Sequence, residues 1–165
     1  MGPVSLVEVI RRVIREHKLA AYARAITIQA KLKPLLVMAD SEKIRIIVDN
    51  LLSNAIKYSP RGGEIRLQLD ERNGYALLDV IDEGPGVSPD ESDKIFDSFY
   101  QGKSSPDGRV KGTGLGLAIT REYVLAHGGR IAVVEDKQGA VPGGHFRVEL
   151  PLDESIQQGM VDELV

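Results

Sequence analysis

The 165-residue chain contains no cysteine, carries a formal net charge of only −3, and has no apolar run long enough to span a bilayer. Without cysteine there are no disulfide bonds and no thiolate metal sites, which fits a cytosolic domain. No secretory signal opens the sequence. The small net charge gives no reason to expect nucleic acid or an acidic membrane surface as a partner.

Histidine is also scarce, whereas glycine is abundant. His17, His127 and His145 are widely separated and none has the spacing of metal ligands, so we interpret them as structural or solvated. The 17 glycines cluster after position 60, which indicates loops that closely approach another group. The length is sufficient for one domain with a proper core.

The most informative element of the sequence is a helix predicted over about residues 41–58. Asp40 or Ser41 can cap its start, and a Ser-Pro-Arg-Gly-Gly segment at 59–63 ends it. Its core face is an apolar stripe at helical spacing, formed by Ile44, Ile47, Val48, Leu51, Leu52 and Ala55. Asn50, Asn54 and Lys57 form a second stripe at the edge of this face. They are either an ordinary polar flank or a site for a metal-bearing anion, since amide oxygens ligate Mg²⁺ and lysine neutralises phosphate.

The other elements follow from periodicity and turn residues. Ser5 and Glu8 form a capping box for a first helix that ends near Tyr22. An Asn73-Gly74 turn joins two alternating strands as a hairpin. Around Pro34, the apolar runs 25–32 and 35–38 are either two strands or one interrupted strand. The other predicted strands cover 64–71, 75–81, 130–135 and 145–150, a closing helix runs to His127, and 153–165 is a polar tail.

The hairpin's second strand runs into Asp82-Glu83-Gly84-Pro85-Gly86-Val87. A carboxylate before a tight Gly-Pro-Gly turn has two interpretations. Asp82 can hydrogen-bond its own backbone in an ordinary turn. Alternatively, it is a fixed acceptor at the floor of a pocket, with glycines that let a flat ligand lie against the backbone.

Two further segments follow. An aromatic cluster at 95–100 precedes a polar segment, 101–111, which we interpret as a mobile loop. Gly112-Thr113-Gly114-Leu115-Gly116-Leu117 then opens the closing helix, and backbone N–H groups at such a helix start form an anion site. This string matches neither a dinucleotide fingerprint nor a Walker loop, because the residues that complete those motifs are missing.

Together and in this order, the four motifs resemble those of the ATP-binding catalytic domain of sensor histidine kinases, in the superfamily that includes gyrase, Hsp90 and MutL. The resemblance covers residues 4–152, with the N box at 50–58, the G1 box at 82–86, the F box at 95–100 and the G2 box at 112–116. It implies a Bergerat ATP-binding fold, an α/β two-layer sandwich in which about three helices cover one face of a mixed five-stranded sheet.

The resemblance also implies roles for individual residues. Asn54 would ligate Mg²⁺, Asn50 and Lys57 would act beside it at the phosphates of ATP, and Asp82 would accept the adenine amino proton. Residues 101–111 would form the ATP lid. The remaining expected ATP contacts are Tyr58, Gly84, Gly86, Val87, Ile95, Phe96, Phe99, Lys103, Arg109, Lys111, Gly112, Thr113, Gly114, Leu115, Gly116 and Leu117.

The sequence departs from the family's patterns at two positions. Many relatives carry Arg directly after the F box, where this chain has Gln101. Which lid cation meets the γ-phosphate is therefore left open among Lys103, Arg109 and Lys111. The superfamily's ATPases carry a general-base Glu four residues before the metal-binding Asn. This chain has Asn50 there, and an amide does not accept a proton at neutral pH. Hydrolysis is therefore disfavoured as the main activity.

The resemblance implies that the γ-phosphoryl group passes to a histidine on a separate dimerisation domain, and that a response regulator is the further partner. His17 lacks the context of a phosphoacceptor, so we expect a catalytic fragment, monomeric by itself. The resemblance also implies a parent anchored in the inner membrane. Two alternatives are a nucleotide-binding regulatory module without phosphotransfer and an ATPase of the chaperone or topoisomerase type.

Overall fold

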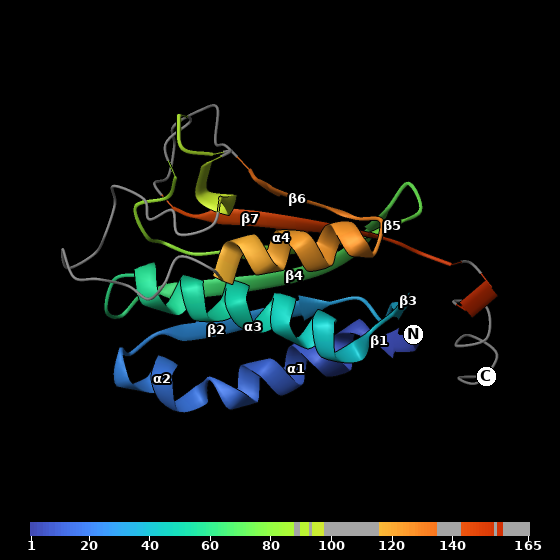
Figure 1. The fold of residues 1–165 in the computed structure, drawn as a ribbon. Helices are drawn as coiled ribbons and strands as arrows, with labels where there is room; N and C mark the ends of the chain where they lie inside the picture. Colours follow the sequence, from blue (N-terminus) through green and yellow to red (C-terminus); the bar gives the residue numbers. More distant parts are fainter. Residues whose placement is uncertain (88–89, 93, 98–115, 135–142, 154, 157–165) are drawn as a thin grey trace.

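The computed structural model describes residues 1–87, 90–92, 94–97, 116–134, 143–153 and 155–156. Two layers make up this part of the chain, a β-sheet and a set of helices packed against one of its faces (Figure 1). The predicted two-layer architecture is therefore confirmed. The predicted tail beyond Ile156 lies outside the described residues.

The main sheet has five strands in the order β2-β4-β5-β7-β6. Strands β2 and β4 are parallel and all other neighbours are antiparallel, so the sheet is mixed as predicted. Positive φ angles of 53° at Asn73 and 82° at Gly74 form the predicted hairpin turn between β4 and β5. The strands are β2 (Thr27–Leu32), β4 (Glu64–Arg72), β5 (Tyr75–Ile81), β6 (Arg130–Val133) and β7 (His145–Pro151).

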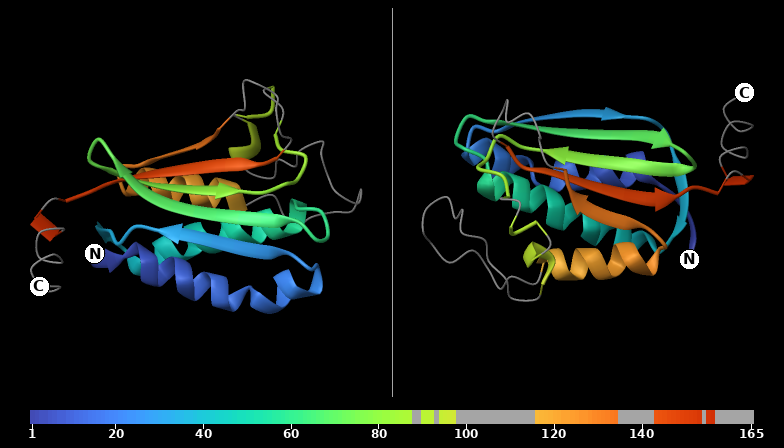
Figure 2. Two further views of the ribbon diagram at one scale, coloured as in Figure 1. Left: turned by 180° about the vertical axis from the view of Figure 1, so that it is seen from behind. Right: turned by 90° about the horizontal axis from the view of Figure 1, so that it is seen from above.

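Helices α1 (Leu6–Glu16), α3 (Ser41–Tyr58) and α4 (Gly116–Ala126) lie on the same side of this sheet (Figure 2). The first helix is interrupted, contrary to the single helix predicted. It ends at Glu16, and a separate short helix α2 (Lys18–Ala23) follows. The junction is His17, whose side chain turns towards α3 and lies 2.7 Å from Asp49 Oδ1. A short 3₁₀ turn, η1 (Lys94–Phe96), precedes α4.

The sequence analysis missed strand β1 (Gly2–Ser5), which pairs antiparallel with β3 (Leu36–Ala39) in a second, two-stranded sheet. A four-residue strand that contains proline gives almost no pattern of its own, and pairing with β3 makes it a strand. Strand β3 leads directly into α3. Of the two candidate caps, Asp40 is the one used, because its carboxylate accepts the N–H groups of Glu42 and Lys43.

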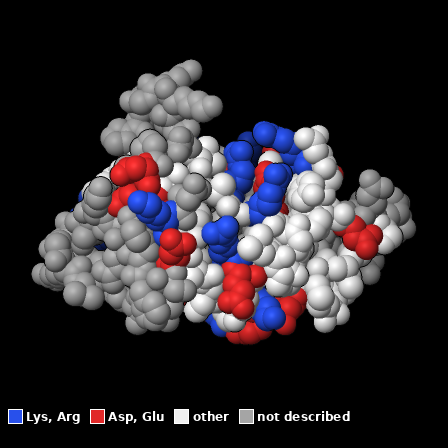
Figure 3. All heavy atoms as spheres, turned by 45° about the horizontal axis from the view of Figure 1, so that its top comes forward, with Lys and Arg blue, Asp and Glu red and all other residues white. Residues whose placement is uncertain are grey.

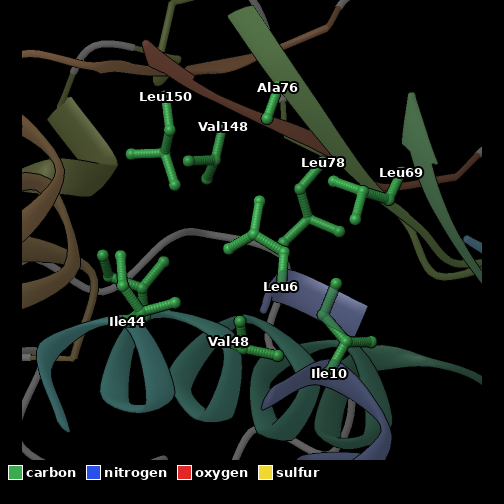
Figure 4. Close-up of a pocket in the computed structure, with 10 residues that line it drawn as sticks. Leu6, Ile10, Ile44, Val48, Leu69, Ala76, Leu78, Val148 and Leu150 are labelled. Atoms are coloured by element: carbon green, nitrogen blue, oxygen red, sulfur yellow. The ribbon is translucent and has the colours of Figure 1, made fainter. Parts of the chain in front are cut away.

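The core lies between the helices and the sheet, and the predicted apolar stripe of α3 is entirely buried in it. Each buried Ile or Leu side chain contributes about 1.5–3 kcal/mol of hydrophobic stabilisation. A small apolar cavity remains among residues of α1, the first half of α3, β4, β5 and β7 (Figure 4). It lies at the end of the sandwich opposite Asn54 and Asp82, and its lining carries no group suited to chemistry.

The other face of the sheet has no helix over it in the part of the chain that the structure describes (Figure 2). On the side shown in Figure 3, Lys and Arg side chains gather near the middle and Asp and Glu side chains lie around them. Asp79 of β5 is only 8% exposed on this face, because Arg147 and His145 of β7 close over it. This cluster stands next to the strand end that carries Asp82.

Candidate functional site

The polar stripe of α3 forms one edge of the candidate site. Asn50, Asn54 and Lys57 are all partly buried, as their position beside the apolar stripe predicts. The Asn50 amide nitrogen donates to the carbonyl oxygen of Gly116 at 3.0 Å and to Thr120 Oγ1 at 3.1 Å. The structure therefore brings the N-box helix against the start of α4, where the glycine string ends.

Asn54 lies one turn further along α3. It is partly buried, and its side chain makes no hydrogen bond with another described residue. The Lys57 ammonium lies 5.7 Å from the centre of the Tyr58 ring. Burial raises the pKa of the Tyr58 hydroxyl, which keeps this ring neutral at the end of the helix.

Asp82 follows directly after β5 and is only 6% exposed. Its Oδ1 accepts the backbone N–H of Gly84 at 2.8 Å and that of Gly144 at 3.1 Å. These bonds close a turn, as the first interpretation predicts, and they also hold the carboxylate in place. Its role as an acceptor for a ligand stays a prediction. Burial raises the pKa of Asp82, although the two N–H groups and the nearby His145 partly oppose that shift.

Close backbone packing requires several glycines here. A Cβ on Gly84 would lie 2.5 Å from the Tyr58 carbonyl oxygen, so this glycine lets the turn contact the end of α3. Gly86 has a φ of +73°, and a Cβ there would lie 2.7 Å from the Gly143 carbonyl oxygen. The predicted need for glycine at 84 and 86 thus has a structural reason, namely contact with α3 and with the start of β7.

Gly143 and Gly144 were missed in the sequence analysis. A Cβ on Gly144 would lie 2.6 Å from Asp82 Oδ2, and a Cβ on Gly143 would overlap the Asp82 carbonyl oxygen. The signal was present as a Gly-Gly pair immediately before a strand. Only the β5–β7 pairing, which places His145 opposite Ile81, shows that this pair meets Asp82.

The apolar residues predicted to contact the ligand are mainly part of the core. Ile95 and Phe96 are 5% and 7% exposed, and the Phe96 ring packs edge-on against Phe146 at 6.2 Å between centroids. Val87 and Leu117 are partly buried and pack against the same core. They hold the turn after Asp82 and the start of α4 in place around the polar groups.

The remaining predicted contacts, Phe99, Lys103, Arg109, Lys111, Gly112, Thr113, Gly114 and Leu115, and the proposed lid at 101–111, lie outside the described residues. Of the glycine string, the structure places only Gly116. These assignments remain predictions.

Each histidine contacts another protein group. His17 pairs with Asp49 on α3, His127 Nε2 accepts the backbone N–H of Asp40, and His145 Nε2 lies 2.7 Å from Asp79 Oδ1. Within the described ranges, no three His, Cys, Asp or Glu side chains come together in a way that could hold a metal ion.

Comparison with known proteins decides the family. The family described as histidine kinase-, DNA gyrase B-, and HSP90-like ATPase matches residues 39–154, which include all of α3, Asp82 and β7. The chain belongs to this family. Within it, the relatives described below are sensor histidine kinases, and this chain is an ATP-binding catalytic domain of that type.

Sensor histidine kinase TmoS of Ectopseudomonas mendocina is 41% identical over 135 residues, which are 81% of this chain and 14% of that protein. Sensor histidine kinase Hik2 of Synechocystis is 35% identical over 164 residues, covering 92% of this chain and 38% of the relative. The chain thus spans well under half the length of these curated kinases.

Solved catalytic domains of the family have the same fold. The mycobacterial sensor histidine kinase MprB superposes with a TM-score of 0.83 at 34% identity, over 92% of this chain and 98% of that one. The catalytic domain of histidine kinase ThkA gives a TM-score of 0.79 at 27% identity, over 92% and 95% of the two chains. Among the helices of the described residues, none is long and apolar enough to cross a membrane.

Proposed function

We propose that residues 1–152 bind Mg-ATP along the α3 edge and the Asp82 turn, and that this domain donates the γ-phosphoryl group to a histidine of a separate dimerisation domain. The observation that carries the proposal is Asp82, a buried carboxylate whose Oδ1 is held by the N–H groups of Gly84 and Gly144. Its second oxygen is then left to accept the amino group of adenine. Guanine would place a carbonyl there, and two acceptors would face each other.

The phosphate groups would lie along the polar stripe of α3. Lys57 would neutralise phosphate charge, and Asn50 would lie beside it near the phosphates. The donors of the G2 box, which ends at Gly116, would meet the phosphates from the other side. Transfer breaks the bond between the γ-phosphorus and its bridging oxygen and forms a bond to the acceptor's imidazole nitrogen. The domain's contribution is positioning and charge neutralisation.

The residues present suit a magnesium ion shared with the nucleotide. Magnesium in such sites takes one or two protein oxygens and fills its other positions with phosphate oxygens and water. Asn54 would hold it, because its amide is not engaged by other described side chains. When bound, the ion neutralises charge on the phosphates.

Phosphotransfer is favoured over hydrolysis because Asn50 stands where the family's ATPases carry their general base. The Asn50 amide nitrogen donates both of its hydrogens within the protein, and an amide oxygen does not take a proton from water at neutral pH. A neutral imidazole is already nucleophilic and needs no such base. The ShkA kinase, whose full-length structure contains AMPPNP, shares this fold at 30% identity.

The partners follow from the same chemistry. The acceptor histidine belongs to a dimerisation domain of the parent, and the phosphoryl group then passes to a response regulator. The domain by itself is a monomer, and the parent is anchored in the inner membrane. Residues 153–165 are a polar tail outside the catalytic domain.

Calorimetric titration with ADP, ATP and GTP, with and without Mg²⁺, tests the binding step. Adenine-selective binding that Mg²⁺ strengthens is the expected result, and Asn54→Ala should weaken binding in Mg²⁺ more than binding without it. Equal loss in both conditions would remove Asn54 from the metal site. Labelled phosphohistidine on an acceptor domain supplied in trans tests the transfer.

Normal nucleotide binding without transfer to any acceptor domain would instead favour the regulatory-module alternative. Steady phosphate release from the purified domain, abolished by Asn54→Ala, would favour the ATPase alternative.

A further inference from the structure

Thr120 is a buried polar residue in a place where the helix α4 otherwise packs apolar side chains. It is 0% exposed, as is Val124 one turn later. Its hydroxyl lies 2.7 Å from the Gly116 carbonyl oxygen and 3.1 Å from the Asn50 amide nitrogen. Asn50, Gly116 and Thr120 therefore form a closed network of three hydrogen bonds between α3 and α4.

The chemistry of the three groups fixes the direction of every bond. A carbonyl oxygen only accepts, so both the Thr120 hydroxyl and the Asn50 amide nitrogen donate to Gly116. The Thr120 hydrogen is then used, and its oxygen accepts the second hydrogen of the Asn50 amide. Both amide hydrogens of Asn50 are thereby engaged on the α4 side, and the planar amide turns Oδ1 away from both acceptors.

We propose that Thr120 is a positioning residue that holds the Asn50 amide in a single orientation, with its oxygen presented to the bound Mg-nucleotide. This inference rests on the function proposed above, because the nucleotide is what meets that oxygen. Without the Thr120 acceptor, the amide keeps one anchor at Gly116 and gains freedom to rotate. The nucleotide would then meet a mixture of amide orientations.

A threonine inside a helix can also bond the carbonyl four residues earlier for purely local reasons. In that case valine, which has the same shape, would replace it without consequence for Asn50. Thr120→Val is therefore the decisive substitution, and Thr120→Ser, which keeps the hydroxyl, is its matched control. Valine keeps the shape of threonine and replaces only the hydroxyl, and the loss of its hydrogen bonds should cost about 1–3 kcal/mol. That is less than the usual stability of a domain, about 5–15 kcal/mol, so the fold should persist.

The first measurement is NMR of the asparagine side chains in ¹⁵N-asparagine-labelled protein. The chain has three asparagines, Asn50, Asn54 and Asn73, so the spectrum contains three amide pairs. Asn73→Gly, which suits the positive φ of that turn, identifies one pair, and Asn54→Ala identifies another. We expect the Asn50 hydrogens to exchange with water several-fold faster in Thr120→Val than in the wild type or Thr120→Ser.

The second measurement is titration of the same variants with ADP and with AMPPNP in the presence of Mg²⁺. Loss of one orienting hydrogen bond should weaken binding by roughly three- to tenfold in Thr120→Val, with recovery in Thr120→Ser. Unfolding midpoints in urea, measured for each variant, establish that the domain is folded under the titration conditions, which separates this effect from a loss of stability.

The two measurements separate the two proposals. Unchanged exchange of the Asn50 amide in Thr120→Val would overturn the positioning role, whatever happens to nucleotide affinity. Faster exchange with unchanged affinity would also overturn it, because the orientation would not matter to the ligand. Failure of the wild type to bind any nucleotide would overturn the proposed function and with it the presentation of this oxygen to a nucleotide.

Discussion

Asp82 and the backbone of Gly144 are joined by two hydrogen bonds, although 62 positions separate them in the sequence. The Gly144 N–H donates to Asp82 Oδ1, and the Asp82 N–H donates to the Gly144 carbonyl at 2.9 Å. The start of β7 is therefore part of the adenine side of the proposed site. Five predictions concern this contact and its surroundings.

Gly144→Ala should weaken ADP and ATP binding by roughly tenfold or more, because the new Cβ would lie 2.6 Å from Asp82 Oδ2 and displace it. Isothermal titration with Mg-ADP measures the loss. Gly129→Ala is the matched control, since its Cβ would overlap the Glu149 carbonyl at the other end of β7. That control should lower stability yet leave the affinity of the folded fraction unchanged. Equal loss of affinity in both variants would contradict a local role for Gly144.

Asp82→Asn should reverse the base preference of the site. The asparagine Oδ1 can still accept the N–H groups of Gly84 and Gly144, so its amide nitrogen takes the place of Oδ2. A donor would then face the adenine amino group, and the ratio of ATP to GTP affinity should fall by roughly tenfold or more. Competition titrations with both nucleotides measure this ratio. Unchanged selectivity would remove Asp82 from the adenine site.

The raised pKa of Asp82 predicts that adenine binding weakens as the pH falls. Its folded pKa lies above the ordinary value of 3.8 because burial disfavours the charged carboxylate. As the pH falls through that raised pKa, Oδ2 gains a proton and ceases to accept the adenine amino group. Mg-ADP affinity should fall more steeply with decreasing pH in the wild type than in Asp82→Asn. The phosphates of ADP titrate in the same way with both proteins, so the comparison removes their contribution. Parallel pH profiles would contradict this assignment.

The raised pKa of Asp82 affects stability in the opposite direction, because acid favours the folded state at this residue while it weakens adenine binding. The folded state holds the Asp82 proton more tightly than the unfolded chain, so this residue's contribution to the free energy of unfolding decreases as the pH rises above 3.8. Asp82→Asn should therefore be as stable as the wild type, or more stable, at neutral pH. Urea denaturation at pH 7 checks this. It also separates loss of binding from loss of fold in the preceding experiments.

Asp79→Asn should destabilise the domain by about 1.5–3 kcal/mol at neutral pH, the range for hydrogen bonds to charged groups. Burial alone would raise the pKa of Asp79, but the hydrogen bonds from His145 and Arg147 outweigh it and hold that pKa below its ordinary value. The stabilisation is present above 3.8, the unfolded value, and is lost as the pH falls through the lower folded pKa.

Urea denaturation from pH 7 down to pH 3 measures the Asp79 effect. Glu71→Gln is the control, because its partner Lys33 is 51% exposed and such a surface pair contributes little. A loss in Glu71→Gln as large as that in Asp79→Asn would show that the sheet's open face responds to charge in general and not to this buried cluster.

Local patterns predicted the elements of the fold well, because each has a complete signal in its own residues. The apolar stripe and the Asp40 cap define α3, and the Asn73-Gly74 turn defines the hairpin. Strand β1 and the break at His17 depend on partners distant in sequence, namely β3 and Asp49. Neither has a periodicity that reveals it.

For the site, residues whose chemistry is unusual for their position could be predicted from the sequence. Two asparagines one turn apart on α3 and a carboxylate before Gly-Pro-Gly are of this kind. Gly144 and Thr120 were not predicted from the sequence, because a glycine before a strand and a threonine in a helix are common. Their importance depends on contact with Asp82 and Asn50, which only strand pairing and helix packing create.

Strand β7 lies between β5 and β6, yet it is made last of the strands that the structure describes. During synthesis, β5 and β6 both emerge before β7, so the edges that pair with β7 are unpaired until it follows. Such edges are prone to pair with other chains. The Asp82 carboxylate also lacks its Gly144 donor during this interval. The adenine side of the site therefore forms only when residues beyond 144 have left the exit tunnel. Nascent chains that stop earlier should aggregate rather than hold nucleotide.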